Sequence, residues 1–188
     1  MQKRKKVLIT LMKNNKIKLL VLSDIHGDIR NAMSVINTQP NADLYVFLGD
    51  GISDMVYCLD DMQRQRLVAV RGNCDLTDNI LGASLKKNEI ISLCGKRIMI
   101  THGDLYGVKY GTAGIEQLAR ESGCDIVLFG HTHRPHEGYS DGVYYFNPGS
   151  VTGGYGIAPS AGLLTLDGDN VLFSFLTPTG GDIPSPFK

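Results

Sequence analysis

Short apolar runs recur along the first half of the chain and alternate with segments of helical periodicity. The runs predict buried strands at 17–23, 43–48 and 66–70. Between them, residues 28–38 carry apolar side chains three or four positions apart, with Asp28 as the N-terminal cap of a helix. Residues 53–62 predict a shorter helix capped by Ser53. Because strand and helix alternate, we expect a parallel sheet with right-handed crossovers here.

The second half of the chain has a different pattern, with short strands separated by turn residues. Residues 89–93 and 97–100 flank Cys94-Gly95-Lys96 and predict a hairpin, and a helix at 112–122 ends at Gly123. The remaining apolar segments predict strands at 125–129, 136–139, 143–146, 162–166 and 171–176. Two sheets packed face to face, with helices outside, suit this mixture of parallel and antiparallel signals.

Length and composition favour a single globular domain. The chain has 188 residues, 43% of them hydrophobic and 20% charged, and its formal net charge is zero. A neutral chain lacks the long-range basic field expected for stable nucleic-acid binding. The four cysteines are widely spaced and contain no C-x-x-C pair. This spacing excludes a zinc ribbon and a dense disulfide framework, so we expect a reduced protein in the cytoplasm.

The two ends of the chain are expected to lie outside the folded domain. The first sixteen residues, MQKRKKVLITLMKNNK, superficially resemble an export signal. Their apolar stretch of about six residues is shorter than the usual 7–15, and lysines follow it where a cleavage site would need small residues. We therefore expect a poorly ordered extension at 1–16, one domain at 17–178, and a loose Gly- and Pro-rich tail at 179–188. No apolar run approaches the roughly 18 residues of a membrane span.

Polar clusters follow the predicted strands at the points where the strands end. They read DIHG, GDG, GNCD, THGD and GHTH, at 24–27, 49–51, 72–75, 101–104 and 130–133. In open α/β sheets the carboxyl ends of the strands form the edge where ligands bind. Each cluster alone is typical of a turn or a helix cap. Together, in this order, they indicate one shared site.

The chemistry of these clusters points to metal binding. They offer two carboxylates, one amide oxygen and four imidazoles, enough donors for two metal ions with water completing the coordination. In D-x-H and H-x-H, we expect an extended backbone to place the two side chains on one side. Mixed oxygen and nitrogen ligands without thiolate suit Mn, Fe, Zn or Co. Two divalent ions and two aspartates leave a charge of about +2, which attracts a phosphate group.

Other polar residues have simpler interpretations. Asp28, Asp54 and Asp75 are predicted to be caps or turn residues, and His136 a structural or rim residue. The sequence Asn147-Pro148-Gly149-Ser150 is typical of a turn, with a position lining the site as the alternative. Small buried cysteines are predicted at positions 58, 94 and 124.

The ordered set D-x-H-G, G-D-G, G-N-C-D, T-H-G-D, G-H-T-H and N-P-G-S resembles the calcineurin-like metallophosphoesterases, in particular their small single-domain branch of YfcE-type phosphodiesterases. The resemblance covers residues 17–178. It implies an α/β fold, a four-layer α/β/β/α sandwich of two mixed sheets flanked by helices. It also implies one metal bound by Asp24, His26 and His133 and a second bound by Asn73, His102 and His131. Asp50 would bridge the two, and Asn73 would also contact the phosphate.

One position departs from the wider family. Where many members have a histidine after the metal-binding asparagine, thought to protonate the leaving oxygen, this chain has Cys74. A thiol with a reference pKa near 8.5, lowered by nearby cations, is a poor general acid. The resemblance therefore implies catalytic roles for Asn73 and His102, and either a catalytic or a packing role for Cys74. Asn73 and Cys74 would also contact the substrate.

The resemblance thus implies an enzyme that hydrolyses phosphodiesters, aryl diesters first, with a metal-bridging hydroxide as nucleophile. Manganese is the preferred metal, with zinc, iron, nickel or cobalt as alternatives. The alternative functions are phosphomonoester hydrolysis and a non-catalytic scaffold like the small retromer subunit, which residues 147–155 also resemble. The expected partner is a small phosphodiester, with no membrane and no stable nucleic acid. A short nucleotide or cyclic nucleotide diester stays open as the substrate, and a homo-oligomer stays open as well. Without a cap domain or long insertion, the sequence predicts no separate specificity pocket.

Overall fold

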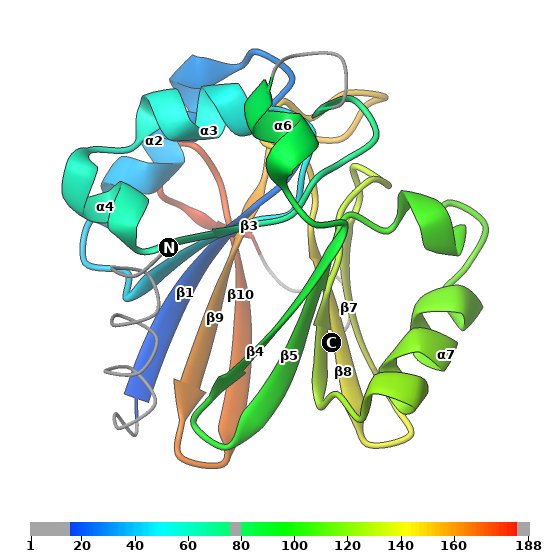
Figure 1. The fold of residues 1–188 in the computed structure, drawn as a ribbon. Coiled ribbons are helices and arrows are strands. Elements are labelled where there is room, and N and C mark those ends of the chain that lie inside the picture. Colours follow the sequence, from blue (N-terminus) through cyan, green and yellow to red (C-terminus); the bar gives the residue numbers. More distant parts are fainter. Residues whose placement is uncertain (1–15, 76–79, 184–188) are drawn as a thin grey trace.

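The computed structural model describes residues 16–75 and 80–183, and in this part of the chain two mixed sheets lie at the centre (Figure 1). The six-stranded sheet has the order β11-β10-β9-β1-β2-β3, and the five-stranded sheet has the order β4-β5-β6-β8-β7. The strands of the first sheet are β1 (Lys16–Leu22), β2 (Leu44–Phe47), β3 (Leu67–Ala69), β9 (Ala161–Asp167), β10 (Asn170–Leu176) and β11 (Asp182–Ile183). Those of the second are β4 (Asn88–Leu93), β5 (Lys96–Thr101), β6 (Ile126–Leu128), β7 (Pro135–Ser140) and β8 (Val143–Pro148).

Helices cover the outer faces of both sheets, which confirms the predicted four-layer sandwich (Figure 1). They are α2 (Ile29–Thr38), α3 (Ile52–Cys58), α4 (Asp61–Gln65), α6 (Ile80–Ser84) and α7 (Ala113–Ser122), with a 3-10 turn, η1, at Asp104–Tyr106. The α2–α3 region packs on the first sheet, and α7 packs on the second through Ile115 and Ala119. The expected parallel pairs are present, β1 with β2, β2 with β3 and β5 with β6.

Three apolar layers explain why the central strands read as continuous hydrophobic runs. In β1, Leu19 and Val21 point into the cluster between the sheets, while Leu20 and Leu22 point toward the helices. A strand that is covered on both faces needs apolar residues at every position. The carboxyl ends of these strands are thereby held in fixed positions, which is what a site built on the following loops requires.

The predicted helix at 53–62 is wrong in its extent. The chain forms two shorter helices, α3 and α4, separated at Leu59. Gly51, with φ of 119°, precedes α3 in place of the predicted cap Ser53. Asp60 caps α4 with a capping box. The Asp60 carboxylate accepts a hydrogen bond from the backbone N–H of Gln63, and the Gln63 side-chain oxygen accepts one from the backbone N–H of Asp60. The predicted caps of the two longer helices, Asp28 and Gly123, are confirmed.

The first sheet extends further at both ends than the sequence predicts. Lys16 is the first residue of β1 and pairs with Asp167, although the sequence assigns it to the extension. The tail beyond residue 178 contains β11, which pairs with β10 through Leu176 and Asp182. The predictions for residues 1–15 and 184–188 lie outside the described residues.

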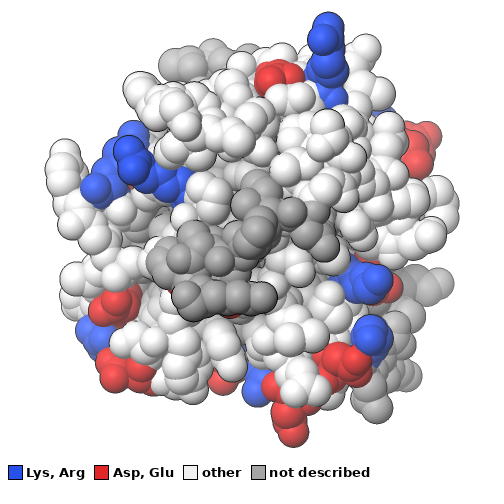
Figure 2. Space-filling view, turned by 180° about the vertical axis from the view of Figure 1, so that it is seen from behind, with Lys and Arg blue, Asp and Glu red and all other residues white. Residues whose placement is uncertain are grey.

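Charged side chains are mixed in sign on the face seen in Figure 2, where blue and red residues lie around an uncharged or grey centre. No extended field of one sign forms on that face among the described residues. In the same part of the chain, none of the helices combines the length and the apolar character needed to cross a membrane.

Candidate metal centre

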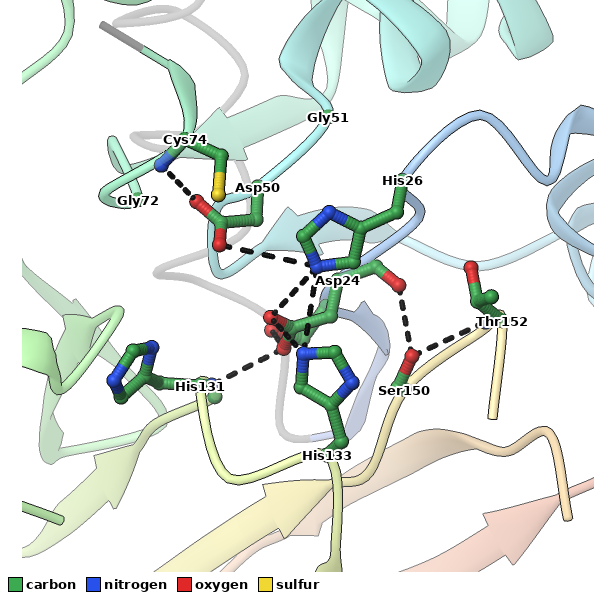
Figure 3. A network of polar contacts seen from close by, with 12 residues as sticks. Asp24, His26, Asp50, Gly51, Gly72, Cys74, His131, His133, Ser150 and Thr152 are labelled. Atoms are coloured by element: carbon green, nitrogen blue, oxygen red, sulfur yellow. Dashed lines mark hydrogen bonds and ion pairs between the residues drawn. The ribbon is translucent and has the colours of Figure 1, made fainter. Parts of the chain in front are cut away.

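The loops that follow β1, β2, β3, β5 and β6 bring all the predicted ligands into one region. A first group contains Asp24, His26 and His133 (Figure 3). Asp24 Oδ1 lies 3.1 Å from His133 Nε2 and 3.7 Å from His26 Nε2. The two Nε2 atoms lie 3.4 Å apart. One carboxylate oxygen and two imidazole nitrogens therefore converge on one point.

A second group forms around His102. Its Nε2 atom lies 3.1 Å from Asn73 Oδ1 and 3.1 Å from His131 Nδ1. Asp50 lies between the two groups, because its Oδ2 atom is 3.4 Å from His102 Nε2 and 3.9 Å from His26 Nε2. The two sets of residues that the family resemblance implies thus coincide with two clusters in space.

The protonation pattern of His102 shows that this second group is suited to a cation. His102 Nδ1 lies 2.8 Å from the carbonyl oxygen of Leu48, which can only accept a hydrogen bond. The proton of the neutral ring therefore sits on Nδ1, and Nε2 presents a lone pair toward the Asn73 oxygen. Several electron-pair donors then face one another, an arrangement that a bound cation would relieve.

The first group is also suited to a cation, because it contains a buried carboxylate oxygen of Asp24. Asp24 is fully buried, and its Oδ1 atom has no hydrogen-bond partner despite the nearby imidazoles. A buried carboxylate oxygen without a partner is costly unless a cation or a hydrogen bond compensates it. The donor sets of both groups therefore fit divalent metal ions with oxygen and nitrogen ligands.

The electrostatics keep both carboxylates ionised. Burial alone would raise the pKa of the Asp24 carboxyl, but His133, His26 and His102 outweigh it and hold that pKa well below its usual range. Burial likewise opposes ionisation of Asp50, and His102 again lowers the pKa below the ordinary value. Both side chains are thus available as anionic ligands.

The pKa values of His131, His26 and His102 are shifted in different directions. Burial, and then the charges of His102 and Lys109, lower the pKa of His131, which favours the neutral, metal-binding ring. The pKa of His26 is raised, mainly by Asp24. Burial would lower the pKa of His102, but Asp50 and Asp24 raise it overall.

The backbone at the ligands is not extended, which corrects the reason given for the D-x-H and H-x-H spacing. Positive φ angles occur at Asp24 (55°), His26 (43°), Asp50 (63°), His131 (67°) and His133 (58°). Non-glycine residues rarely adopt this left-handed conformation, and such strain concentrates at functional sites. The tight turns send His131 toward His102 and His133 toward Asp24, so one short loop serves both groups.

Asp75 holds the Asp50 loop in place. Its buried carboxylate accepts hydrogen bonds from four backbone N–H groups, those of Asp50 (2.9 Å), Gly51 (2.8 Å), Ile52 (3.0 Å) and Gly72 (2.8 Å). The sequence predicts a cap or turn residue at Asp75, and the structure adds that it orients the candidate bridging ligand. Its spacing from the GN pair of the third cluster is the only sequence signal for this role.

The prediction of a turn at N-P-G-S is wrong for its first two residues, because Asn147 and Pro148 end strand β8. Residues of this segment support the loops of the candidate site by hydrogen bonds. Asn147 Nδ2 donates to the Gly130 carbonyl (2.9 Å) and to Thr132 Oγ1 (3.0 Å). Ser150 Oγ donates to the Asp24 carbonyl at 2.9 Å (Figure 3). Thr132 is thereby engaged with Asn147, whereas the histidines on either side of it reach the two groups.

Cys74 lies beside Asp50, and its backbone N–H donates to Asp50 Oδ1 at 2.7 Å (Figure 3). Asn73 Nδ2 lies 3.2 Å from its sulfur. Burial, together with Asp50, raises the pKa of the Cys74 thiol to about 11. Burial and Asp50 therefore shift the pKa of Cys74 in the direction opposite to the lowering expected from two bound cations. Of the cysteines predicted to be buried, Cys58 and Cys124 are, and Cys94 is partly exposed.

Fold and site together define the class of a metal-dependent hydrolase built on an α/β/β/α sandwich. Residues 17–169 match the family model described as the calcineurin-like phosphoesterase superfamily domain. The chain therefore belongs to the calcineurin-like phosphoesterases, a family that binds divalent metals. This confirms the resemblance drawn from the ordered motifs.

Two relatives illustrate the range of this family. The probable metallophosphoesterase YsnB of Bacillus subtilis is 28% identical over 181 residues, which cover 89% of this chain and 95% of YsnB. The phosphodiesterase YfcE of Escherichia coli is 29% identical over 155 residues, covering 72% of this chain and 80% of YfcE. The YfcE structure matches with a TM-score of 0.66 over 89% of this chain and 97% of that one.

The same fold also occurs in Vps29, a vacuolar protein sorting protein. The structure of Vps29 from Entamoeba histolytica in complex with zinc has a TM-score of 0.65 and 23% identity, covering 86% of this chain and 92% of Vps29. At this level of identity, the likeness concerns the fold alone.

Proposed function

We propose that this chain hydrolyses phosphodiesters with two divalent metal ions, one held by Asp24, His26 and His133 and the other by Asn73, His102 and His131, with Asp50 between them. The observation that carries this proposal is the position of Asp50 Oδ2, which lies within 4 Å of an imidazole nitrogen of each group. The phosphodiesterase activity in the name of the relative YfcE supports the choice of substrate.

Metal ions at these positions would supply a nucleophilic hydroxide at neutral pH and neutralise the charge on the phosphoryl oxygens. The protein contributes preorganised ligands, since Asp75 fixes the Asp50 loop and the Leu48 carbonyl fixes the tautomer of His102. We expect the amide of Asn73 also to contact a phosphoryl oxygen. His102 acts as a metal ligand, because its Nδ1–H is engaged with the Leu48 carbonyl and its Nε2 atom faces the metal position. Manganese is the metal we expect, with zinc, iron, nickel or cobalt as substitutes.

The leaving group decides between diester and monoester substrates. Burial and the neighbouring Asp50 raise the pKa of the Cys74 thiol, which makes Cys74 a weak acid, whereas two bound cations would act in the opposite direction. An aryl leaving group departs without needing a proton, so aryl phosphodiesters should be good substrates. Changing Cys74→His should raise the rate on monoesters relative to diesters if this position sets the preference.

The test combines metal analysis with turnover of bis(p-nitrophenyl) phosphate. Protein purified without chelator should retain divalent metal, and added Mn²⁺ should support hydrolysis. Asp50→Ala and His131→Ala should each lower kcat by roughly a hundredfold or more, the scale typical for loss of a charge-stabilising group. Asp61→Ala, which removes an exposed carboxylate on α4, is the matched control. Full activity in Asp50→Ala protein would contradict the proposal.

The competing function is a non-catalytic scaffold, and the fold that this chain shares with Vps29 is compatible with it. A scaffold would bind metal without turning over any phosphoester. The metal-loaded protein, assayed on aryl monoesters and diesters, separates the two functions, since activity on either supports an enzyme and activity on neither supports the scaffold.

A further inference from the structure

A cavity of about 580 Å³ lies beside the candidate metal centre. It shares the GHTH loop with that centre, because Thr132, between the ligands His131 and His133, lines it. The sequence predicts no specificity pocket, for lack of a cap domain or a long insertion. The cavity forms instead from three short segments that are distant in the chain, at 108–112, 129–136 and around Tyr155.

Two cationic side chains line this cavity, Lys109 and Arg134. Among residues 16–75 and 80–183, neither of them takes part in a salt bridge. Arg134 directly follows the ligand His133, and Lys109 is near enough to His131 to affect it electrostatically. Two cations that share a cavity without a neutralising carboxylate form a site for an anion. The chain as a whole is neutral, so this positive charge is local.

An exposed aromatic side chain also lines the cavity. Tyr155 is 91% exposed and has a φ of 52°, within a turn closed by the bridge between Gly154 and Ile157. A tyrosine that is both exposed and held in the left-handed region costs stability and is typical of a contact residue. Phe129 and Pro135 add apolar lining. The cavity thus combines an anion site with a surface on which a planar ring can stack.

We propose that this cavity binds a nucleotide arm of the substrate, with a terminal phosphate at Lys109 and Arg134 and the base stacked on Tyr155. The inference rests on the proposed phosphodiesterase function and names its substrate class, a short oligonucleotide with a terminal phosphate. A purely aryl arm would leave both cations without a partner. The volume lies within the range of roughly 300–1,000 Å³ found for small-molecule sites.

The reaction would consume one water molecule. Its oxygen bonds to the phosphorus of the diester and one P–O ester bond breaks. Of the two protons of the water, one ends on the departing alkoxide, delivered through solvent because Cys74 is a weak acid, and the other is released to solvent. The terminal phosphate in the cavity takes no part in bond breaking. It orients the substrate, so its effect should appear in kcat/KM.

The experiment compares two dinucleotides that differ only in that phosphate, pTpT and TpT. With Mn²⁺-loaded wild-type protein we expect kcat/KM for pTpT to exceed that for TpT by roughly tenfold or more, as for charge-assisted hydrogen bonds. Arg134→Ala and Lys109→Ala should bring the ratio toward one. Arg120→Ala, at the C-terminal end of α7, is the matched control and should keep the wild-type ratio.

The stacking role of Tyr155 is tested separately. Tyr155→Ala should lower kcat/KM for both dinucleotides by roughly tenfold, whereas Tyr155→Phe should restore it, because stacking needs the ring and not the hydroxyl. Tyr110→Ala is the control, since Tyr110 is 98% exposed and does not line the cavity. Equal activity of Tyr155→Ala and wild type would refute the stacking.

Binding of the bisphosphate pTp, measured by calorimetry, provides a readout that does not depend on turnover. We expect binding to wild-type protein and at least tenfold weaker binding to Arg134→Ala. If wild-type protein hydrolyses bis(p-nitrophenyl) phosphate but does not distinguish pTpT from TpT, the cavity inference is wrong and the proposed function stands. If metal-loaded protein hydrolyses none of the three esters, the proposed function is wrong, and pTp binding alone then decides whether the cavity takes a nucleotide.

Discussion

At the scale of single residues, the candidate ligands depend on groups that never touch a metal. Asp24, His26, Asp50, His131 and His133 all have the left-handed backbone. Such turns persist only where the surroundings fix them. The close approach of Gly72 shows how tightly this is done, because a Cβ on Gly72 would lie 2.1 Å from Asp50 Oδ1. The strained backbone is therefore held by contacts of the protein itself.

Asp75 offers the sharpest test of this support. Asp75→Ala leaves four buried or partly buried N–H groups of the Asp50 and Gly72 loops without their acceptor, which should lower the free energy of unfolding by about 3 kcal/mol or more. The affinity for Mn²⁺ should fall as well, because Asp50 loses its position. Asp75→Asn retains one oxygen acceptor and should be intermediate. Urea unfolding and calorimetric titration with Mn²⁺ measure the two effects.

Asp54, in the first turn of α3, serves as the control for Asp75. Asp54 accepts a single backbone bond, from Gly27 N at 2.9 Å. Asp54→Ala should therefore cost only about 1 kcal/mol. If Asp75→Ala and Asp54→Ala lower the free energy of unfolding equally, the four hydrogen bonds of Asp75 contribute no more to stability than the single bond of Asp54.

At the scale of elements, the break between α3 and α4 is fixed by local chemistry. The α4 helix buries no residue of its own, so its capping box at Asp60 should supply much of its stability. We expect Asp60→Ala to lower the free energy of unfolding by about 1 kcal/mol. Metal affinity should be unchanged, since α4 contributes no candidate ligand.

Asp61 provides the comparison for this helix. Its carboxylate is 92% exposed, and its ion pair within the described part of the chain is with Arg64 at 3.1 Å. Asp61→Ala should change stability by less than about 0.5 kcal/mol, as for other exposed i,i+3 pairs. If urea unfolding cannot distinguish the Asp60 and Asp61 variants, the capping box does not hold α4.

The elements also show what a sequence can predict and where it stops. The strands before the polar clusters were predictable because a strand buried on both faces reads as a continuous apolar run, as β1 does. The predicted helix at 53–62 is too long because an aspartate such as Asp60 can lie within a helix or cap one. The capping box with Gln63 shows that Asp60 begins a new helix. The left-handed ligands and the four bonds to Asp75 depend on contacts between distant loops, which periodicity does not encode. The cavity at Lys109 and Tyr155 escaped prediction for the same reason.

At the scale of the whole molecule, each candidate metal group draws ligands from both sheets. Asp24, His26 and Asn73 follow strands of the six-stranded sheet, and His102, His131 and His133 follow strands of the five-stranded sheet. An ion in either group would therefore tie the two sheets together at their carboxyl ends. Because such an ion binds only the folded chain, it should stabilise the fold by about 2.7 kcal/mol at a free concentration of 100 times its dissociation constant.

The stability of the metal-free protein should also depend on pH, because the pKa values of the candidate ligands are shifted in the folded state. The folded-state pKa values of His26 and His102 are raised, so without metal their contribution to stability is fully present below about pH 6.5 and is lost as the pH rises through the raised values. His131 and His136, whose pKa values are lowered by burial, change in the opposite sense. The carboxylates of Asp24 and Asp50, with lowered pKa values, lose their contribution only in acid, below about pH 4.

Metal ions and protons compete for the same ring nitrogens, so the rise in Tm caused by Mn²⁺ should be larger at pH 8 than at pH 6. Thermal unfolding of chelated and Mn²⁺-loaded protein at both pH values measures this difference. The His26→Ala variant removes one of the imidazole rings for which metal ions and protons compete. It should therefore reduce the difference between the Tm increments at pH 8 and pH 6. A Tm increment from Mn²⁺ that is the same at pH 6 and pH 8 would mean that the ion does not displace protons from these histidines, and would place it elsewhere on the molecule.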